Sequence, residues 1–313
     1  MSYKITVVIP TYNRLAVLKK TLMYIGNQSI GREQYQIIVV DDGSTDGTGE
    51  YLKTLNGIDY FINETNKGRA VTRNTGIYLA KSDFLLFLDD DIWADEDLIK
   101  NHIEKHKDNK VVVGAIYPAK EIKTNAINKY YNKHHLWCVK EMEKNRDNLP
   151  YNFLKTANLS IDRDVLKNVG SFDERFYKYG CEDTELGMRL KKHGYNIIYN
   201  KNAIGYHYHD ETVISFIKKT IDSIESSEML ASLKYNCDNE YNGFFTPKFH
   251  NKDNIRNIIY NIVKIILFKE QVAKINKMVV ESLNNVKLFQ PLLVKYNIPI
   301  LKIQYLYKYS EKN

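Results

Sequence analysis

The chain has 313 residues, 43% of them hydrophobic, and a formal net charge of +7. This length allows one large domain with an appendage or two domains, and the composition is that of a globular protein, which excludes a disordered chain. No apolar run reaches the roughly 20 residues that span a bilayer, and no signal sequence is recognisable. The three scattered cysteines indicate neither a cysteine-based zinc site nor a disulfide framework, so we expect a cytoplasmic protein.

Strands and helices alternate in the first part of the chain. Short apolar runs predict strands at residues 5–9, 36–40, 60–62 and 84–88. Apolar residues at helical spacing predict helices at residues 15–25, 51–55 and 68–80. This alternation is typical of an α/β fold with a Rossmann-like, mostly parallel central sheet that helices cover on both faces.

Acidic residues directly follow two of the expected strands. Asp89, Asp90 and Asp91 come after the strand at 84–88, and Asp41 and Asp42 come after an earlier one. The carboxyl ends of parallel strands meet at one edge of a sheet, where open α/β folds bind their ligands. Three adjacent carboxylates suit a hard divalent ion such as Mg²⁺ or Mn²⁺. The alternative interpretation is a solvated acidic turn or helix cap.

The second part of the chain is less regular. A further helix is expected at 95–106 and a strand at 111–113, but the periodicity fades from 120 to 150. A segment of this kind inside a compact domain is a functional lid or disordered. An acidic pair then opens a helix near 182–194, and only helical patterns follow residue 211. We therefore expect two parts, a catalytic domain at 1–210 and a helical region at 211–313.

Five motifs, in this order, resemble the motif set of family 2 glycosyltransferases. They are Val8-Ile9-Pro10-Thr11-Tyr12-Asn13-Arg14, Val40-Asp41-Asp42-Gly43-Ser44-Thr45-Asp46, Asn66-Lys67-Gly68 with Arg73-Asn74-Gly76, Leu88-Asp89-Asp90-Asp91 and Gly180-Cys181-Glu182-Asp183. Enzymes of that family have the GT-A fold, depend on a metal ion, invert the anomeric carbon and use nucleotide-sugar donors. The resemblance covers roughly residues 3 to 210 and implies these properties for this chain.

The resemblance also implies the residues that bind the donor. It places Pro10, Thr11, Tyr12 and Arg14 in the loop that holds the nucleotide. It makes Asp41 or Asp42 the acid that contacts the base, with Asp42 slightly favoured. It places Gly68 and Arg73 beside the ribose and phosphates.

Further resemblance concerns the metal ion and the catalytic base. Asp89, Asp90 and Asp91 match the DxD motif, in which Asp89 and Asp91 bind Mn²⁺ or Mg²⁺. His207, or His209 two residues later, is a candidate third metal ligand, with packing in an aromatic stretch as the alternative.

Asp183 matches the general base. The adjacent Glu182 either raises the pKa of Asp183 or binds the acceptor, while the alternative for both acids is a helix cap.

The implied activity is an inverting, hexosyltransferase-type reaction. A UDP-sugar is the default donor, and the acceptor is a hydroxyl group of a glycan, a lipid-linked sugar or a protein, as in bacterial cell-surface polysaccharide synthesis. The chain lacks the Gln-x-x-Arg-Trp motif of processive synthases, so we expect the addition of one sugar. The alternatives are a sugar-1-phosphate nucleotidyltransferase, which ordinarily carries a Gly-rich loop after the first strand, and a non-catalytic sugar-nucleotide-binding partner.

The last part of the chain is basic. From Gly243 onward it holds 12 Lys and Arg against 4 Asp and Glu, whereas the preceding residues are close to neutral. One interpretation is a basic amphipathic helix at the inner face of a membrane, near a lipid-linked acceptor. The other is a set of helices that pack on the catalytic domain or in a homo-oligomer. No nucleic-acid partner is expected, because the basic residues form no recognisable module.

Overall fold

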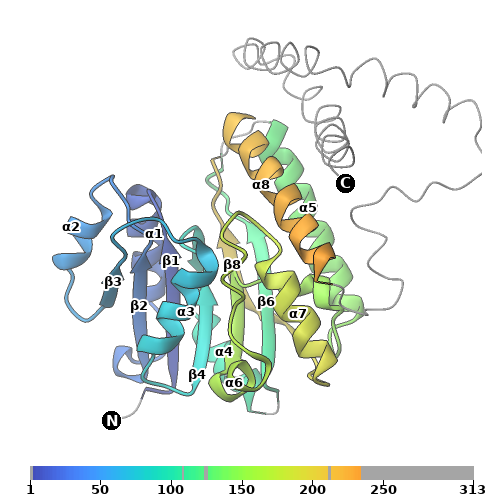
Figure 1. Cartoon of the computed structure of the whole chain (residues 1–313). Helices are drawn as coiled ribbons and strands as arrows, with labels where there is room; N and C mark the ends of the chain where they lie inside the picture. The colour runs from blue at the N-terminus through green and yellow to red at the C-terminus, as the bar shows by residue number, and fades with distance from the viewer. Residues whose placement is uncertain (1–2, 108, 123–125, 211–212, 234–313) are drawn as a thin grey trace, which may run out of the picture. The chain divides into compact units, whose positions relative to one another are not determined.

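The computed structural model describes residues 3–107, 109–122, 126–210 and 213–233 (Figure 1). The chain divides into two units, one of residues 1–123 with 130–210 and one of residues 124–129 with 211–313. Of the second unit, the structure describes chiefly helix α8, Val213–Ser232. The helices expected in the basic tail lie outside the described residues, so the roles expected for residues 211–313 stay predictions.

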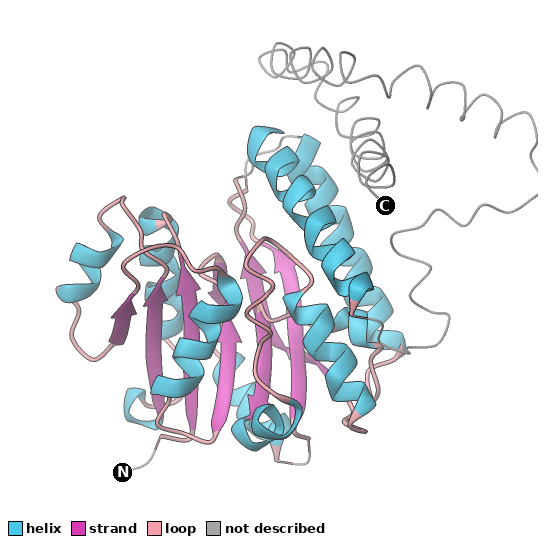
Figure 2. Ribbon diagram, viewed as in Figure 1, coloured by secondary structure: helices cyan, strands magenta, loops and turns pink. Residues whose placement is uncertain are grey.

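The first unit contains one eight-stranded sheet with helices on both faces (Figure 2). The strands are β1 Ile5–Thr11, β2 Tyr35–Asp41, β3 Asp59–Ile62, β4 Phe84–Leu88, β5 Ile92–Ala94, β6 Val111–Pro118, β7 Asn158–Asp162 and β8 Ile198–His207. The α-helices are α1 Leu15–Gly26, α2 Thr48–Lys53, α3 Arg69–Leu79, α4 Leu98–His106, α5 Ala126–Lys144, α6 Arg163–Val169 and α7 Glu182–Lys192. Two short 3₁₀-helices cover Arg32–Gln34 and Tyr151–Phe153.

The strand order is β3-β2-β1-β4-β7-β6-β8-β5. The first four strands run parallel, whereas β7 is antiparallel to both of its neighbours and β5 is antiparallel to β8. The α/β class is thus confirmed, in a mixed sheet whose parallel half contains all four strands predicted before residue 90.

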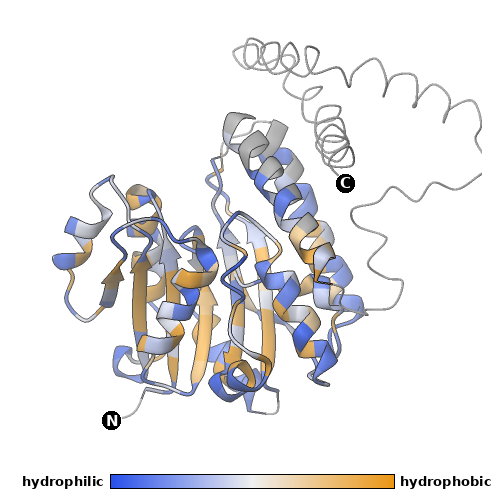
Figure 3. Ribbon diagram, in the orientation of Figure 1, coloured by the Kyte–Doolittle hydropathy of each residue, from blue (hydrophilic) through white to orange (hydrophobic). Residues whose placement is uncertain are grey.

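Alternating residues of the central strands form two separate cores. Val8 and Phe87 belong to the core that contains α3, α6 and α7, and Ile9 and Leu88 belong to the core of α1 and α4. Successive side chains of a strand point to opposite faces, so a strand that is apolar throughout is buried on both sides. Figure 3 shows the result as apolar colour along β4 and much of β2.

The structure corrects the expectation of an irregular segment from 120 to 150. Helix α5 occupies most of it, and Cys138 and Met142, four residues apart, both pack on the core of α3, α6 and α7. Residues three and four apart share a helix face. His135 lies three residues before Cys138 and therefore on the same side of α5. The many His, Tyr and Asn residues, which have modest helix propensity, obscured this periodicity.

Candidate active site

The parallel half of the sheet brings the predicted acids to one edge. Thr11, the last residue of β1, pairs with Asp41, the last residue of β2, and β4 runs parallel on the other side of β1. The loops after β1 and β2 are fastened together, because Asn13 Oδ1 accepts a hydrogen bond of 2.7 Å from the Thr45 backbone N–H. Pro10 is buried within β1, whereas Tyr12 stands just beyond it with 44% of its surface exposed.

Asp90 is the internal anchor of the acidic turn after β4. Its carboxylate accepts hydrogen bonds from the Thr11 hydroxyl at 2.7 Å and from Arg14 Nη1 at 2.9 Å. Burial raises the pKa of Asp90 to about 6, although the charge of Arg14 opposes this shift. Two of the predicted nucleotide-loop residues thus hold the turn that carries the expected metal ligands.

Asp91 is paired with two cationic or potentially cationic groups. Its Oδ2 lies 2.7 Å from Arg14 Nη1 and 3.1 Å from His207 Nε2. Burial alone would raise the pKa of Asp91, but Arg14 and His207 hold it well below its usual range. Asp91 is therefore an ionised carboxylate at the sheet edge, beside an imidazole.

Arg73 joins the acids after β4 to those at the start of α7. Its side chain is 1% exposed, and its two terminal nitrogens lie 2.9 Å from Asp89 Oδ1 and 2.9 Å from Glu182 Oε1. Among the described residues, Glu182 Oε2 is buried without a hydrogen-bond partner. A buried arginine between two carboxylates fixes their separation, so the acids from positions 89 and 182 belong to one charged cluster.

Asp183 follows Glu182 in the first turn of α7. Its Oδ1 accepts a hydrogen bond of 2.7 Å from the Thr184 backbone N–H, and its side chain is half-buried. Burial and the charge of Glu182 raise the pKa of Asp183, while Lys155 and Arg73 act in the opposite direction. The raised pKa makes this carboxylate a stronger proton acceptor than an ordinary surface aspartate.

The two acids after β2 have different surroundings. Both oxygens of Asp42 are occupied by the loop before α3, because they accept hydrogen bonds from Asn63 Nδ2 and from the backbone N–H groups of Lys67 and Gly68. Asp41 accepts from Ser44 through Oδ1 only, and its Oδ2 is buried without a partner among the described residues. Burial raises the pKa of Asp41. Asp42 thus holds the loop, and Asp41 retains a free oxygen.

Gly68 occupies a position that only glycine can fill. Its φ of +89° lies in the region that L-residues avoid, and a Cβ there would stand 2.6 Å from the backbone oxygen of Tyr177. The start of α3 therefore touches the segment that leads into α7. Arg69, the next residue, stacks 4.6 Å over the ring of Tyr179, and the charge of Asp89 raises its pKa despite burial.

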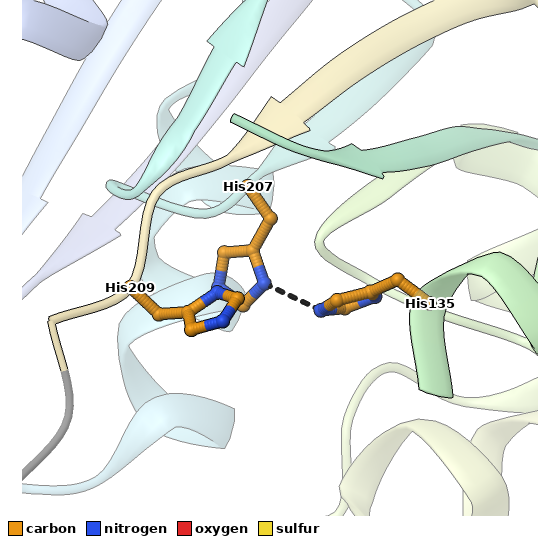
Figure 4. A group of neighbouring side chains, drawn as sticks. All are labelled: His135, His207 and His209. Carbon is orange, nitrogen blue, oxygen red and sulfur yellow. Dashed lines mark hydrogen bonds between the residues drawn. The ribbon is translucent and has the colours of Figure 1, made fainter. Parts of the chain in front are cut away.

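Three histidines complete the described part of this edge (Figure 4). Potential ligand atoms of His135, His207 and His209 all lie within 4.8 Å of one another. The predictions included His207 and His209 at the metal site but not His135, whose helix α5 was not foreseen. The signal that would have found it is the helical spacing of His135, Cys138 and Met142.

Comparisons with protein-family models and with known sequences both match this chain to glycosyltransferases. The family model described as "Glycosyl transferase family 2" matches residues 6–170. Validoxylamine A glucosyltransferase of Streptomyces hygroscopicus subsp. jinggangensis is 29% identical over 229 residues, which cover 64% of this chain and 54% of that protein. The uncharacterized glycosyltransferase YfnE of Bacillus subtilis is 25% identical over 79% of this chain and 73% of its own length. The chain thus spans about half the length of the first relative.

Solved structures with the same fold are also found. The mannosyltransferase PcManGT from Pyrobaculum calidifontis, in complex with GDP-Man and Mn²⁺, has a TM-score of 0.55 at 18% identity, covering 74% of this chain and 65% of that one. S. aureus TarS 1-349 with UDP-GlcNAc has a TM-score of 0.53 at 17% identity, covering 75% and 67%. These matches confirm the predicted GT-A fold. Within the described residues, no helix combines the length and apolar character that a membrane crossing requires.

Proposed function

The chain belongs to glycosyl transferase family 2, and from this premise we propose that it moves one sugar from a nucleotide sugar to an acceptor hydroxyl group with inversion at the anomeric carbon. The observation that carries the proposal is the Arg73 bridge, which holds Asp89 of the metal-type motif and Glu182 of the base-type motif at 2.9 Å each. Chemistry at an anomeric carbon needs a leaving-group site and a base beside each other, and this cluster supplies both.

The nucleotide end of the donor fits the loops after β1 and β2. Tyr12 offers an exposed ring for stacking, and Asp41 offers the oxygen that has no partner among the described residues. We favour Asp41 over Asp42 as the contact to the base, because Asp42 already fixes the loop before α3. Gly68 and Arg73 then stand on the side of the ribose and the phosphates. UDP is our default nucleotide.

The residues present fit a divalent metal ion. Asp91 is held in its ionised form, Asp89 is 21% exposed in its side chain, and His207 lies 3.1 Å from Asp91. Two carboxylates with one imidazole suit Mn²⁺, while Mg²⁺ prefers oxygen alone. When bound, such an ion stabilises the negative charge that develops on the departing diphosphate. Asp89, Asp91 and the Nε2 atom of His207 would hold it.

Asp183 is the proposed general base. Its carboxylate takes the proton of the acceptor hydroxyl, whose oxygen forms the new bond to the anomeric carbon as the bond from that carbon to the diphosphate oxygen breaks. The nucleoside diphosphate leaves with the bonding electron pair. The neighbouring Glu182 has a buried Oε2 atom without a partner among the described residues, and we assign it to a hydrogen bond from the acceptor. Attack opposite the leaving group inverts the anomeric configuration.

A thermal-shift panel tests the donor class. We expect a UDP-sugar with Mn²⁺ to raise the melting temperature of the full chain by several degrees, because a ligand at 100 times its Kd adds about 2.7 kcal/mol to the stability of the folded state. The same sugar nucleotides with EDTA should give a much smaller shift. Equal shifts with and without the metal ion would contradict the metal-dependent donor site. A larger shift with GDP-sugars would replace the uridine assignment.

A further inference from the structure

Two elements far apart in sequence bring three imidazoles together beside the donor site. His135 comes from the inner face of α5, His207 is the last residue of β8, and His209 follows two residues later. The ring centroid of His207 lies 4.8 Å from that of His135 and 4.8 Å from that of His209 (Figure 4). His209 is buried, and the other two rings are half-buried. Packing alone does not require three side chains to direct nitrogen atoms toward one another.

The two nitrogens of His207 face different neighbours. Its Nδ1 lies 2.8 Å from His135 Nε2, and its Nε2 lies 3.1 Å from Asp91 Oδ2. Histidines that ligate a metal through one nitrogen commonly donate the other N–H to a carboxylate, which fixes the tautomer and strengthens the ligand. The same arrangement is present here. Nδ1 of His207, which faces His135, would bind the metal ion, and Nε2 of His207 would donate its N–H to Asp91.

The chemistry of the three side chains selects the kind of ion. Neutral imidazole nitrogens suit Zn²⁺ and Co²⁺, whereas Mg²⁺ prefers oxygen ligands. Metal–nitrogen bonds of about 2.0–2.1 Å in a tetrahedral site place the ligand nitrogens roughly 3.3 Å apart. The ligand atoms of the three histidines lie within 4.8 Å of one another, so a small rotation of the rings would bring them to that spacing.

We propose that His135, His207 and His209 form a site for a transition-metal ion of the Zn²⁺ class that fills without any nucleotide sugar. Three histidines with water in the remaining position make a complete tetrahedral site. An ion on Nδ1 of His207 keeps the proton of that ring on Nε2, where it is donated to Asp91. The Nε2 atom of His207 can then no longer bind the donor metal ion, so Zn²⁺ inhibits Mn²⁺-dependent sugar transfer. This consequence, unlike the site itself, rests on the proposed function.

Cobalt titration of the tag-free, nucleotide-free full chain tests the site. We expect one Co²⁺ to bind with the visible absorption bands of a tetrahedral ion, and Zn²⁺ to displace it. His135→Gln should weaken Co²⁺ binding by at least about tenfold. His134→Gln, on the neighbouring residue of the same helix, is the matched control and should bind Co²⁺ like the parent. Circular dichroism and melting curves of each variant verify folding.

Two further measurements separate this proposal from the donor site. Asp89→Asn removes an expected donor-metal ligand and should leave the Co²⁺ spectrum unchanged, even if no sugar transfer is ever found. Octahedral Co²⁺ bands, or equal Co²⁺ affinity in the parent and in His135→Gln, would overturn the three-histidine site. If the site is found but Zn²⁺ leaves Mn²⁺-dependent transfer unchanged, the competition through His207 is wrong.

Discussion

Replacing Asp183 with Asn is expected to lower kcat/KM for sugar transfer by about 10²–10⁴-fold, the usual contribution of a general base. The amide keeps the size of the side chain but cannot accept the proton of the attacking hydroxyl group. Because Asp183 stands at α7, outside the loops assigned to the nucleotide, the affinity for UDP should stay within about twofold of the parent value by calorimetry. A loss of turnover without a loss of binding would identify a group that acts in the chemical step.

The pH dependence of the same reaction provides an independent check. Only ionised Asp183 accepts a proton, so kcat/KM should fall as the pH drops through the pKa of this residue. Burial and the charge of Glu182 raise that pKa, so the fall should come at a higher pH than for an ordinary aspartate.

The control for the Asp183 substitution is Asp164→Asn, at an exposed acid of α6, which should transfer sugar like the parent. Unchanged turnover in Asp183→Asn would eliminate the base assignment.

Asp91→Asn is expected to weaken Mn²⁺-dependent UDP binding by about 100-fold or more, beyond the 10–100-fold typical of residues that only support a metal ligand. The substitution removes an ionised carboxylate and leaves Arg14 Nη1 and His207 Nε2, which now lie 2.7 Å and 3.1 Å from it, facing a neutral amide. Arg14 would then keep only the Asp90 carboxylate, 2.9 Å from Nη1, as its partner, and its less compensated charge would also repel the metal ion. Calorimetric titration with UDP in Mn²⁺ and in EDTA measures the effect.

The control for this prediction lies at the other end of the same strand. Asp83, just before β4, is exposed and far along the strand from the acidic turn, so Asp83→Asn should bind UDP and Mn²⁺ like the parent. Parent-like affinity in Asp91→Asn would remove this residue from the metal site. If the melting temperature fell equally in Asp91→Asn and Asp83→Asn, the substitutions would have caused a general loss of stability. That result would count against a specific role for Asp91 in metal binding.

The parallel half of the fold was accessible from the sequence for a physical reason. A strand such as Phe84–Leu88, apolar at every position, must be buried on both faces. Strands β1 and β2 are buried along their whole length as well, and three such strands with intervening helices leave few arrangements. The antiparallel half was less accessible. Strand β5, Ile92–Ala94, has only three residues, and its pairing with β8 depends on a chain segment more than one hundred residues away.

The same distinction holds for the candidate active site, where local features could be predicted from the sequence and tertiary contacts could not. The sequence located Asp91 in the turn after β4 and Asp183 in the first turn of α7, because strand ends and helix starts are local features. It did not show that Arg73 would be buried between Asp89 and Glu182, nor that Asp42 would hold the loop before α3, because these contacts depend on tertiary packing. His135 was missed for another reason, since His, Tyr and Asn residues of modest helix propensity dominate the part of its helix that ends at His135.

The configuration of the released sugar tests the central claim most directly. Proton NMR can follow an α-linked UDP-sugar incubated with the full chain and Mn²⁺, using either an accepted alcohol or water as the acceptor. A single displacement with Asp183 as the base predicts that the β-anomer appears first and that EDTA abolishes its formation. First appearance of the α-anomer, or equal consumption of the donor in EDTA, would contradict the account.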